Sequence, residues 1–365
     1  MVLLKTVPTA YGATFSQAWS TVPGQNFSGG TFKYSNITSF PGAPAMSATL
    51  INLTVGGIRG IHWHDEAEWA YVLSGTCRSV VMEEGRTHPA ETWDYGEGDI
   101  WYFRPNEGHM VQGLAPSGCS YLAGYNNGSF SDPDSPSMAA WLDRLPVNIR
   151  MQGLGGPRLQ QNSTNSANSV AGFITQGPMP APSLEAFRAS VRKPAQPAVT
   201  LTHRYQLSQQ APKSASEGGS ITAADKENFP ISEAMLGALI VLRPGGMRQL
   251  HWHTNEDEWQ YVINGTILAG VFTAGGHHEE NTLYAGDAGY APMSSAHWFK
   301  NVGSTDSYVV LIFNAGQLTN LEATALVANM PAEVLAADLG ITAESARALN
   351  PDIPSVAPPL NNTTS

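Results

Sequence analysis

The sequence is poor in charged residues, and above all in positive charge. Charged residues make up 13% of the 365 residues, and 19 basic against 30 acidic side chains give a net charge of -11. Nucleic acids and anionic membranes both bind basic surfaces, so this balance argues against either as a partner. No apolar run approaches the roughly 20 residues that a membrane-spanning helix needs. The sequence also lacks a nucleophile elbow, a P-loop and a dinucleotide-binding fingerprint, which excludes the enzyme classes built on those motifs.

Cysteine is almost missing, since Cys77 and Cys119 are the only two. Both lie on predicted strands in the first half of the chain. They form either a disulfide or a pair of buried thiols, because the sequence does not give the Cα separation that a disulfide requires.

Lysine is also scarce, with six residues, whereas eight Asn-x-Ser/Thr sequons are present. This combination favours a secreted protein whose leader has been removed, because Met1–Lys5 is too short to be the apolar region of a signal peptide. A cytoplasmic location is the alternative. The sequons begin at Asn26, Asn36, Asn52, Asn127, Asn162, Asn264, Asn361 and Asn362.

Apolar and turn-forming residues are abundant. Hydrophobic residues make up 42% of the chain, and 36 glycines and 25 prolines accompany them, which is typical of a turn-rich β protein. Short β-branched or aromatic runs between turn residues predict an antiparallel sandwich or barrel. In the first half these runs are Ala45–Leu53, Glu68–Leu73, Arg78–Met82, Ile100–Phe103 and Ser120–Gly124. In the second half they are Ala234–Leu242, Glu258–Ile263, Ile267–Phe272, Gly289–Ala291 and Tyr308–Phe313.

The chain contains two copies of one pattern. Arg59 and His62 recur 189 residues later, whereas the offset is 190 for Glu68 and 188 for His109. An offset that changes by one or two residues between fixed landmarks indicates two similar domains with different loop lengths. The length of 365 residues agrees with two domains of about 100 to 200 residues each.

We expect helices after each β domain. They are predicted at Ser137–Leu145, Leu321–Met330, Pro331–Leu339 and Thr342–Leu349, with Pro331 at a first helical position. The segment between the domains is rich in Gly, Pro, Ser, Asn and Gln, and is predicted as a linker with one short helix at Leu184–Val191. The expected order is an irregular N-terminal arm (1–30), a first β domain with its helix (31–152), the linker (153–200), a second β domain with its helices (201–350) and a loose C-terminal tail (351–365).

Six of the ten histidines belong to two sets with the spacing of metal ligands. Side chains at positions i and i+2 of a strand point to the same face, so the two histidines of each His-Trp-His string can bind one ion. A nearby glutamate and a distant histidine complete each set. The predicted ligands are His62, His64, Glu68 and His109 for the first set and His251, His253, Glu258 and His297 for the second. Three imidazoles and one carboxylate leave two adjacent positions open on an octahedral ion such as manganese or iron, whereas zinc favours a tetrahedron.

These motifs resemble the cupin superfamily, and their duplication resembles the bicupins of the oxalate decarboxylase type. The resemblance covers roughly residues 30–345 and is carried by the strings at 57–75, 98–109, 245–261 and 286–297. It implies an all-β fold of two tandem jelly-roll barrels with short flanking helices. It further implies one manganese ion per barrel with iron as the alternative, dioxygen as a cofactor, oxalate as a small-molecule substrate, and homo-oligomers that are trimers or hexamers.

An arginine precedes the first histidine of each set by three residues, Arg59 in the first copy and Arg248 in the second. This odd spacing would place the arginine on the opposite face of a straight strand, so contact with the metal requires a bend at Gly60 or Gln249. The resemblance implies that such a contact exists and that each guanidinium holds the far carboxylate of oxalate. A structural or surface arginine is the alternative.

The loop after the first barrel, residues 129–136, departs from the family pattern. The resemblance implies a glutamate there as proton donor, and Asp132, one methylene shorter and followed by Pro133, aligns with it. We expect Asp132 or Asp134 to protonate the substrate carbon, with turn formation or capping of the helix from Ser137 as the alternative.

A second departure lies in the other half. Leu311 stands where the family often has a glutamate, and leucine cannot transfer a proton. We therefore expect catalysis at the first centre and a structural or accessory second centre.

The predicted function is a manganese-dependent oxalate decarboxylase that converts oxalate to formate and CO2. The alternatives are an oxalate oxidase that yields CO2 and hydrogen peroxide, a non-catalytic manganese-binding bicupin, and a cupin enzyme acting on a larger acid. Of the other histidines, His277 and His278 are expected in solvent, and His88 and His203 have no evident partner.

Overall fold

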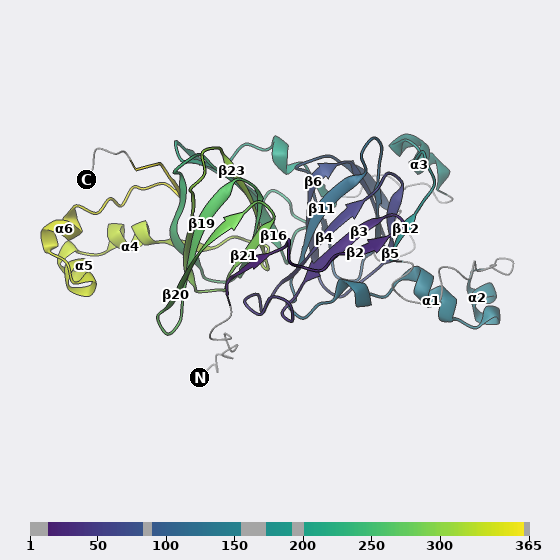
Figure 1. The fold of residues 1–365 in the computed structure, drawn as a ribbon, viewed down its shortest axis with the longest axis horizontal. Helices are drawn as coiled ribbons and strands as arrows, with labels where there is room; N and C mark the ends of the chain where they lie inside the picture. Colours follow the sequence, from purple (N-terminus) through teal and green to yellow (C-terminus); the bar gives the residue numbers. More distant parts are fainter. Residues whose placement is uncertain (1–13, 83–89, 155–172, 192–200, 361–365) are drawn as a thin grey trace.

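The computed structural model describes residues 14–82, 90–154, 173–191 and 201–360. Two antiparallel β-barrels lie side by side, and short helices project from the far end of each (Figure 1). Each barrel consists of two facing sheets. This confirms the predicted all-β fold with two barrels and short flanking helices.

The first barrel combines a seven-stranded sheet, in the order β13-β9-β6-β11-β4-β3-β2, with a five-stranded sheet, in the order β12-β5-β10-β7-β8. Its strands are β2 (Gln25–Phe27), β3 (Gly30–Ser35), β4 (Ser47–Leu53), β5 (Gly57–His62), β6 (Glu68–Gly75), β7 (Cys77–Met82), β8 (Glu91–Tyr95), β9 (Ile100–Phe103), β10 (Gly108–Gly113), β11 (Cys119–Tyr125), β12 (Ile174–Gln176) and β13 (Arg204–Tyr205).

The second barrel combines a seven-stranded sheet, in the order β1-β21-β18-β23-β16-β15-β14, with a six-stranded sheet, in the order β20-β19-β22-β17-β24, and β25 also pairs with β17. Its strands are β1 (Ser16–Ala18), β14 (Ser214–Ser216), β15 (Gly219–Ala224), β16 (Leu236–Leu242), β17 (Met247–His253), β18 (Glu258–Asn264), β19 (Thr266–Thr273), β20 (His277–Tyr284), β21 (Asp287–Ala291), β22 (Ala296–Asn301), β23 (Ser307–Phe313), β24 (Asn320–Glu322) and β25 (Val356–Ala357).

The helices follow the barrels as predicted, with one addition. They are α1 (Met138–Arg144), α2 (Val147–Leu154), α3 (Leu184–Ser190), α4 (Ala323–Asn329), α5 (Ala332–Leu339) and α6 (Ala343–Arg347). Ser137 caps α1, since its hydroxyl accepts a hydrogen bond from the Ala140 N–H. Pro331 is the N-cap of α5, one position before the predicted one. None of the helices in the described residues is long and apolar enough to cross a bilayer.

The two barrels exchange short strands. β1, from the first half, pairs with β21 of the second barrel, and β13, from the start of the second half, pairs with β9 of the first barrel. The predicted arm at 1–30 is therefore not irregular where the structure describes it, because its residues 16–18 and 25–27 form strands. Periodicity did not reveal them, since two or three residues are too few to show an alternation.

The predicted linker and tail also contribute strands. β12 lies within 153–200 and pairs with β5, and β25 lies within 351–365 and pairs with β17 in the equivalent register. Both segments cover the edge of the strand that carries the first histidines of a metal-ligand set. Their backbones satisfy hydrogen-bonding groups that would otherwise face outward at a sheet edge.

Three apolar clusters form the core. One lies inside each barrel, and the third combines residues from both barrels, including Trp69 and Trp259. Matching contacts cross between the barrels, since the Ala45 N–H donates to the Tyr290 hydroxyl and the Ala234 N–H donates to the Tyr102 hydroxyl. The duplication seen in the sequence is thus preserved in the packing between the barrels.

A disulfide joins Cys77 on β7 to Cys119 on β11, with the Cα atoms 5.3 Å apart. It therefore connects the two sheets of the first barrel. This settles the choice between a disulfide and two thiols that the sequence left open.

Candidate metal centres

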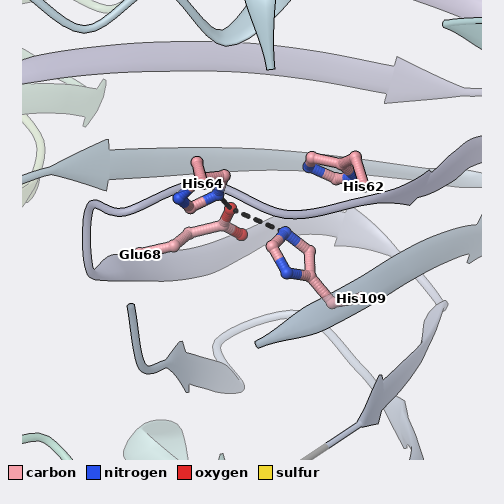
Figure 2. A group of neighbouring side chains, drawn as sticks. All are labelled: His62, His64, Glu68 and His109. Atoms are coloured by element: carbon pink, nitrogen blue, oxygen red, sulfur yellow. Dashed lines mark ion pairs between the residues drawn. The ribbon is translucent and has the colours of Figure 1, made fainter. Parts of the chain in front are cut away.

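The first predicted ligand set converges inside the first barrel. His62 lies at the end of β5, Glu68 begins β6 and His109 lies on β10, while His64 is in the turn between β5 and β6. The four ligand atoms lie within 4.8 Å of one another, and all four side chains are buried. Figure 2 shows the Glu68 carboxylate between His64 and His109, with His62 facing them from the neighbouring strand.

Backbone carbonyls fix the orientation of the three imidazoles. The Nδ1 atoms of His62, His64 and His109 lie 2.8 to 2.9 Å from the carbonyl oxygens of Gly60, Glu66 and Glu107. Each Nδ1 therefore carries the proton and donates it, which leaves each Nε2 as a lone-pair donor toward the centre.

Glu68 is held as a carboxylate. Its Oε1 accepts a hydrogen bond of 2.8 Å from the Trp101 indole, and its Oε2 lies 3.5 Å from the Nε2 atoms of His64 and His109. Burial raises the pKa of Glu68, but the two imidazoles outweigh this and hold the pKa well below its usual value. Burial and the nearby Arg59 cation hold the pKa of His62 well below its usual value. The set thus offers a charged oxygen and an unprotonated nitrogen to an ion.

Two buried atoms of this set, the Nε2 atoms of His64 and His109, have no hydrogen-bond partner among the residues that the structure describes. Buried polar atoms are rarely left without a partner, and a metal ion at the centre of the set would provide one. Three imidazole nitrogens and one carboxylate oxygen fit manganese or iron.

The second set repeats this arrangement. His251 and His253 lie on β17, Glu258 begins β18 and His297 lies on β22, again with ligand atoms within 4.8 Å of one another. The Nδ1 atoms of His251 and His297 lie 2.7 and 2.8 Å from carbonyl oxygens two residues earlier. The Oε1 atom of Glu258 accepts a hydrogen bond from the Gln260 amide, whereas the Oε1 atom of Glu68 accepts one from the Trp101 indole.

The charges around His253 differ from those around His64. The Glu256 carboxylate lies 3.0 Å from its Nδ1 and the Glu258 carboxylate 3.0 Å from its Nε2. Burial lowers the pKa of His253, but the two carboxylates raise it to about 9.

Both arginines reach the metal centres by the predicted bend. On β5 and β10, His62 pairs with His109 and Arg59 pairs with Val111, so two residues of β5 face one residue of β10. The same bulge separates Arg248 from His251 on β17. An extra residue on one strand changes which face the following side chains occupy, and this brings arginine and histidine to the same face.

The lid, which we define as residues 129–136, closes over the first centre. Asp132 is buried, its Oδ1 accepts a hydrogen bond of 2.7 Å from Arg59 Nη2, and this oxygen lies 4.0 Å from His62 Nε2. Asp134, the other candidate acid, is exposed to solvent. The structure therefore brings Asp132, and not Asp134, next to the metal ligands.

A pocket of about 470 Å³ lies on the outer side of the lid. Its lining combines Arg59 and Phe173 with lid residues and with Trp63, Trp141 and Arg144. The pocket reaches the Arg59 side chain from outside, so it connects the buried guanidinium with the protein surface.

The structure places several residues at the centres that sequence reasoning missed. Trp101 and Gln260 hold the glutamate ligands, Phe173 stacks on Arg59, and Glu322 pairs with Arg248 at 2.9 Å. They lie between 2 and 114 residues from their partners in the sequence. No sequence motif marks these positions. Only Trp101, next to the Gly-Asp string, stands close to a recognisable motif.

The remaining histidines have ordinary surroundings, with one exception. His277 and His278 are exposed on β20, as expected. His88 lies outside the described residues. His203 is fully buried, with its two ring nitrogens bonded to Glu91 and Glu107. The expectation that His203 has no partner is therefore wrong, because Glu91, at the start of β8, and Glu107, just before β10, are both distant in sequence.

The sequence matches the cupin family over residues 21–154 and 205–347. It is 30% identical to the oxalate decarboxylase OxdC of Bacillus subtilis over 314 residues, which cover 86% of this chain and 78% of that protein. It is 28% identical to a probable oxalate decarboxylase of Arthroderma benhamiae over 319 residues, which cover 87% and 76%.

Solved structures give the same result. A mutant of the Bacillus subtilis oxalate decarboxylase superposes with a TM-score of 0.84 at 29% identity, over 95% of this chain and 89% of that one. A structure solved to assign the Mn(II) centres of the same enzyme superposes with a TM-score of 0.84 at 28% identity, with the same coverage.

Proposed function

This chain belongs to the cupin family, with one cupin domain in each half, and we propose that it is a manganese-dependent oxalate decarboxylase whose first centre carries the reaction. One observation supports this best. Asp132, on the lid, is buried, hydrogen-bonded to Arg59 and 4.0 Å from a ligand nitrogen of His62. A carboxylic acid (Asp132), a cation that can bind a substrate carboxylate (Arg59) and a set of metal ligands therefore lie next to one another.

His62, His64, Glu68 and His109 would hold the ion. When bound, manganese supplies two open coordination positions and one-electron chemistry with dioxygen, which is the cofactor we propose. Manganese is chosen over iron because the related Bacillus subtilis enzyme has Mn(II) centres.

Arg59 orients the substrate, and Asp132 supplies the proton. The guanidinium holds one carboxylate of oxalate by charge-assisted hydrogen bonds, which directs the bond between the two carbons toward Asp132. That bond breaks, one carbon leaves as CO2, and the other takes a proton and becomes formate. Asp132 Oδ1 lies 4.0 Å from His62 Nε2, so the lid acid is close to where a substrate bound to the ion would lie.

The second centre lacks this arrangement. Arg248 is bonded to Glu322 on β24, and β24 pairs with β17 along residues 251–253. In the first barrel the corresponding contact is a single bridge between His62 and Ser137. Opening the first centre therefore breaks fewer backbone hydrogen bonds. Leu311, at the position where the family often has a glutamate, is buried and cannot transfer a proton, so we assign the second centre a structural or accessory role.

Oxalate oxidase is the second candidate, and the Arg59–Asp132 contact favours it in one respect. Asp132 Oδ1 accepts a hydrogen bond from Arg59, so in this arrangement it presents no donor toward the substrate carbon. Without protonation the electrons pass to dioxygen, which gives CO2 and hydrogen peroxide. A non-catalytic manganese-binding protein is disfavoured, because binding a metal does not require a buried arginine beside the ligands.

Product analysis tests the proposal. Oxalate is supplied in air to the manganese-loaded protein and to the matched variants His109→Ala and His297→Ala, and formate and peroxide are measured. We expect the wild-type protein to release formate, His109→Ala to release none, and His297→Ala to retain most of the rate. Asp132→Ala should lose formate and gain peroxide.

Other outcomes have defined meanings. Formate that disappears only in His297→Ala would place the reaction at the second centre. Peroxide as the wild-type product would make the protein an oxidase, and the absence of both products from metal-loaded protein would leave a binding role.

We also propose that the protein is secreted. Four sequon asparagines, Asn26, Asn52, Asn127 and Asn264, are exposed and thus accessible to glycosylation. Asn36 is buried, and its side chain donates to the Phe130 carbonyl. A mass shift on treatment of the natural protein with an endoglycosidase would support secretion.

A further inference from the structure

The Arg59 guanidinium rests on an aromatic ring. Its Cζ atom lies 3.6 Å from the centre of the Phe173 ring, and both side chains are buried. A cation over the face of a desolvated ring is attracted by the electron-rich face. Phe173 comes from the segment between the barrels, 114 residues after Arg59.

The backbone fixes Phe173 in this place. Its carbonyl accepts a hydrogen bond of 3.2 Å from the Gly60 N–H, within the bulge that turns Arg59 toward the metal centre. The next residue, Ile174, pairs with Arg59 on β5. The ring is therefore positioned by the same short strand that covers the edge of β5.

A ring face accepts no ordinary hydrogen bond, so Phe173 leaves the donors of Arg59 free. Nη2 donates to Asp132, and Nε has no hydrogen-bond partner within the described part of the chain. An incoming carboxylate that takes the place of Asp132 meets a guanidinium that is already oriented and desolvated, which lowers the entropic cost of binding.

The second centre provides a comparison within the same chain. Val356 pairs with Arg248 as Ile174 pairs with Arg59, and the Ser355 carbonyl accepts from the Gln249 N–H at 3.1 Å. Ser355 therefore occupies the position that Phe173 has in the first barrel, and it offers no ring.

Arg248 is held by hydrogen bonds instead. Its Nη1 donates to Glu322 at 2.9 Å and to the Ser355 carbonyl at 3.2 Å, and Gln249 binds the other oxygen of Glu322 at 2.7 Å. A substrate carboxylate would have to break this network before it reached Arg248.

We propose that Phe173 is a positioning residue of the first centre, which holds the Arg59 guanidinium flat and available to a carboxylate of the substrate. Its replacement by Ser355 at the equivalent position is one reason why the second centre does not bind substrate in the same way. This proposal rests on the proposed function, because it takes oxalate as the ligand of Arg59.

Binding of oxalate without turnover tests the proposal. Calorimetric titration of the manganese-loaded protein in the absence of dioxygen gives the dissociation constant, and steady-state assays in air give kcat and KM. We expect Phe173→Leu, which keeps an apolar side chain, to weaken binding and raise KM by about tenfold, the order of a desolvated cation–π contact. Phe173→Tyr should stay within about twofold of wild type, and Ser355→Ala should change neither value.

Metal content and thermal unfolding of each variant separate positioning from a structural role, because Phe173 also packs on Phe27 and Phe32. The proposal is overturned if fully metal-loaded Phe173→Leu binds oxalate as tightly as wild type, or if Phe173→Tyr is as weak as Phe173→Leu. Weaker oxalate binding in Phe173→Leu with no product from the wild-type protein would contradict the proposed function and leave this inference standing.

Discussion

His203 should make the stability of the protein fall between neutral and alkaline pH. Its imidazole is fully buried, with Nδ1 bonded to Glu91 and Nε2 to Glu107 at 3.0 Å. Burial lowers the pKa of His203, but the two carboxylates raise it to about 9, against 6.5 for an unperturbed histidine. The folded protein therefore binds one proton more than the unfolded chain between these two values.

This difference in pKa fixes the direction and the size of the pH effect on stability. A raised pKa in the folded state gives stability that is complete below pH 6.5 and is lost as the pH rises to about 9. The difference of 9 - 6.5 = 2.5 units corresponds to about 3 kcal/mol, at about 1.4 kcal/mol per unit. Glu91, whose pKa His203 helps to lower to about 2, belongs to the same ion pair and adds no second contribution at alkaline pH.

Urea denaturation at pH 6 and pH 9 measures this loss. In wild-type protein the free energy of unfolding should fall by about 3 kcal/mol more over this range than in His203→Gln, because glutamine does not titrate. His278→Gln is the matched control, since His278 is half exposed and its removal should leave the wild-type dependence unchanged. Equal pH dependence in wild type and His203→Gln would refute the reasoning and show that the buried imidazole is neutral in the folded state.

Two further predictions concern the first barrel. The double variant Cys77→Ala/Cys119→Ala opens a loop of 42 residues, and its free energy of unfolding in urea should be lower by about 4 kcal/mol. Equal stability of the oxidised and the reduced wild-type protein would contradict this prediction. Trp101→Phe removes the indole bond to Glu68 and should weaken manganese binding at the first centre by about tenfold to a hundredfold, measured by chelator competition. Gln260→Leu should do the same at the second centre only, and equal effects on both centres would contradict the assignment.

The sequence was sufficient where a residue pattern has a fixed geometric meaning. The spacing of His62 and His64 places both on one face of a strand, and the odd spacing of Arg59 required a bend. The structure has that bend as a bulge in both barrels. Longer strands could also be predicted, because four or more residues are enough to show a strand pattern. One of them, β9, has the predicted bounds, Ile100–Phe103.

Prediction failed where a position depends on partners that are distant in sequence. Strands β1, β12, β13 and β25 have two or three residues each, and only pairing with the other segment makes them strands. Their residues lie in stretches rich in glycine, proline and polar side chains, so local propensity favoured loops. The prediction for His203 failed for the same reason, because neither of its carboxylate partners lies near it in the sequence.

These short strands determine how the two centres differ. The ligands and the bulge before them are duplicated, and so are the carbonyls that orient the first and last histidine of each set, so both barrels bring a complete ligand set together. His253 differs from His64, since its Nδ1 lies 3.2 Å from the Thr319 carbonyl and not near one two residues away. The differences lie in the segments that cover the exposed edges of β5 and β17. Beside β5 lie Phe173, the lid and a single bridge at Ser137, directly after the lid. Beside β17 lie the Ser355 carbonyl and, on the paired strand β24, Glu322.

A carboxylate substrate needs a cation whose hydrogen-bond donors are free and a cover that opens. Arg59 meets the first condition because a ring, which accepts no ordinary hydrogen bond, holds it, and the lid meets the second because few backbone bonds fix it. Arg248 differs in both respects, since its Nη1 already donates to Glu322 and Ser355 and β24 pairs along the edge of β17. We propose that divergence of these covering segments, rather than of the metal ligands, separates a catalytic centre from an accessory one.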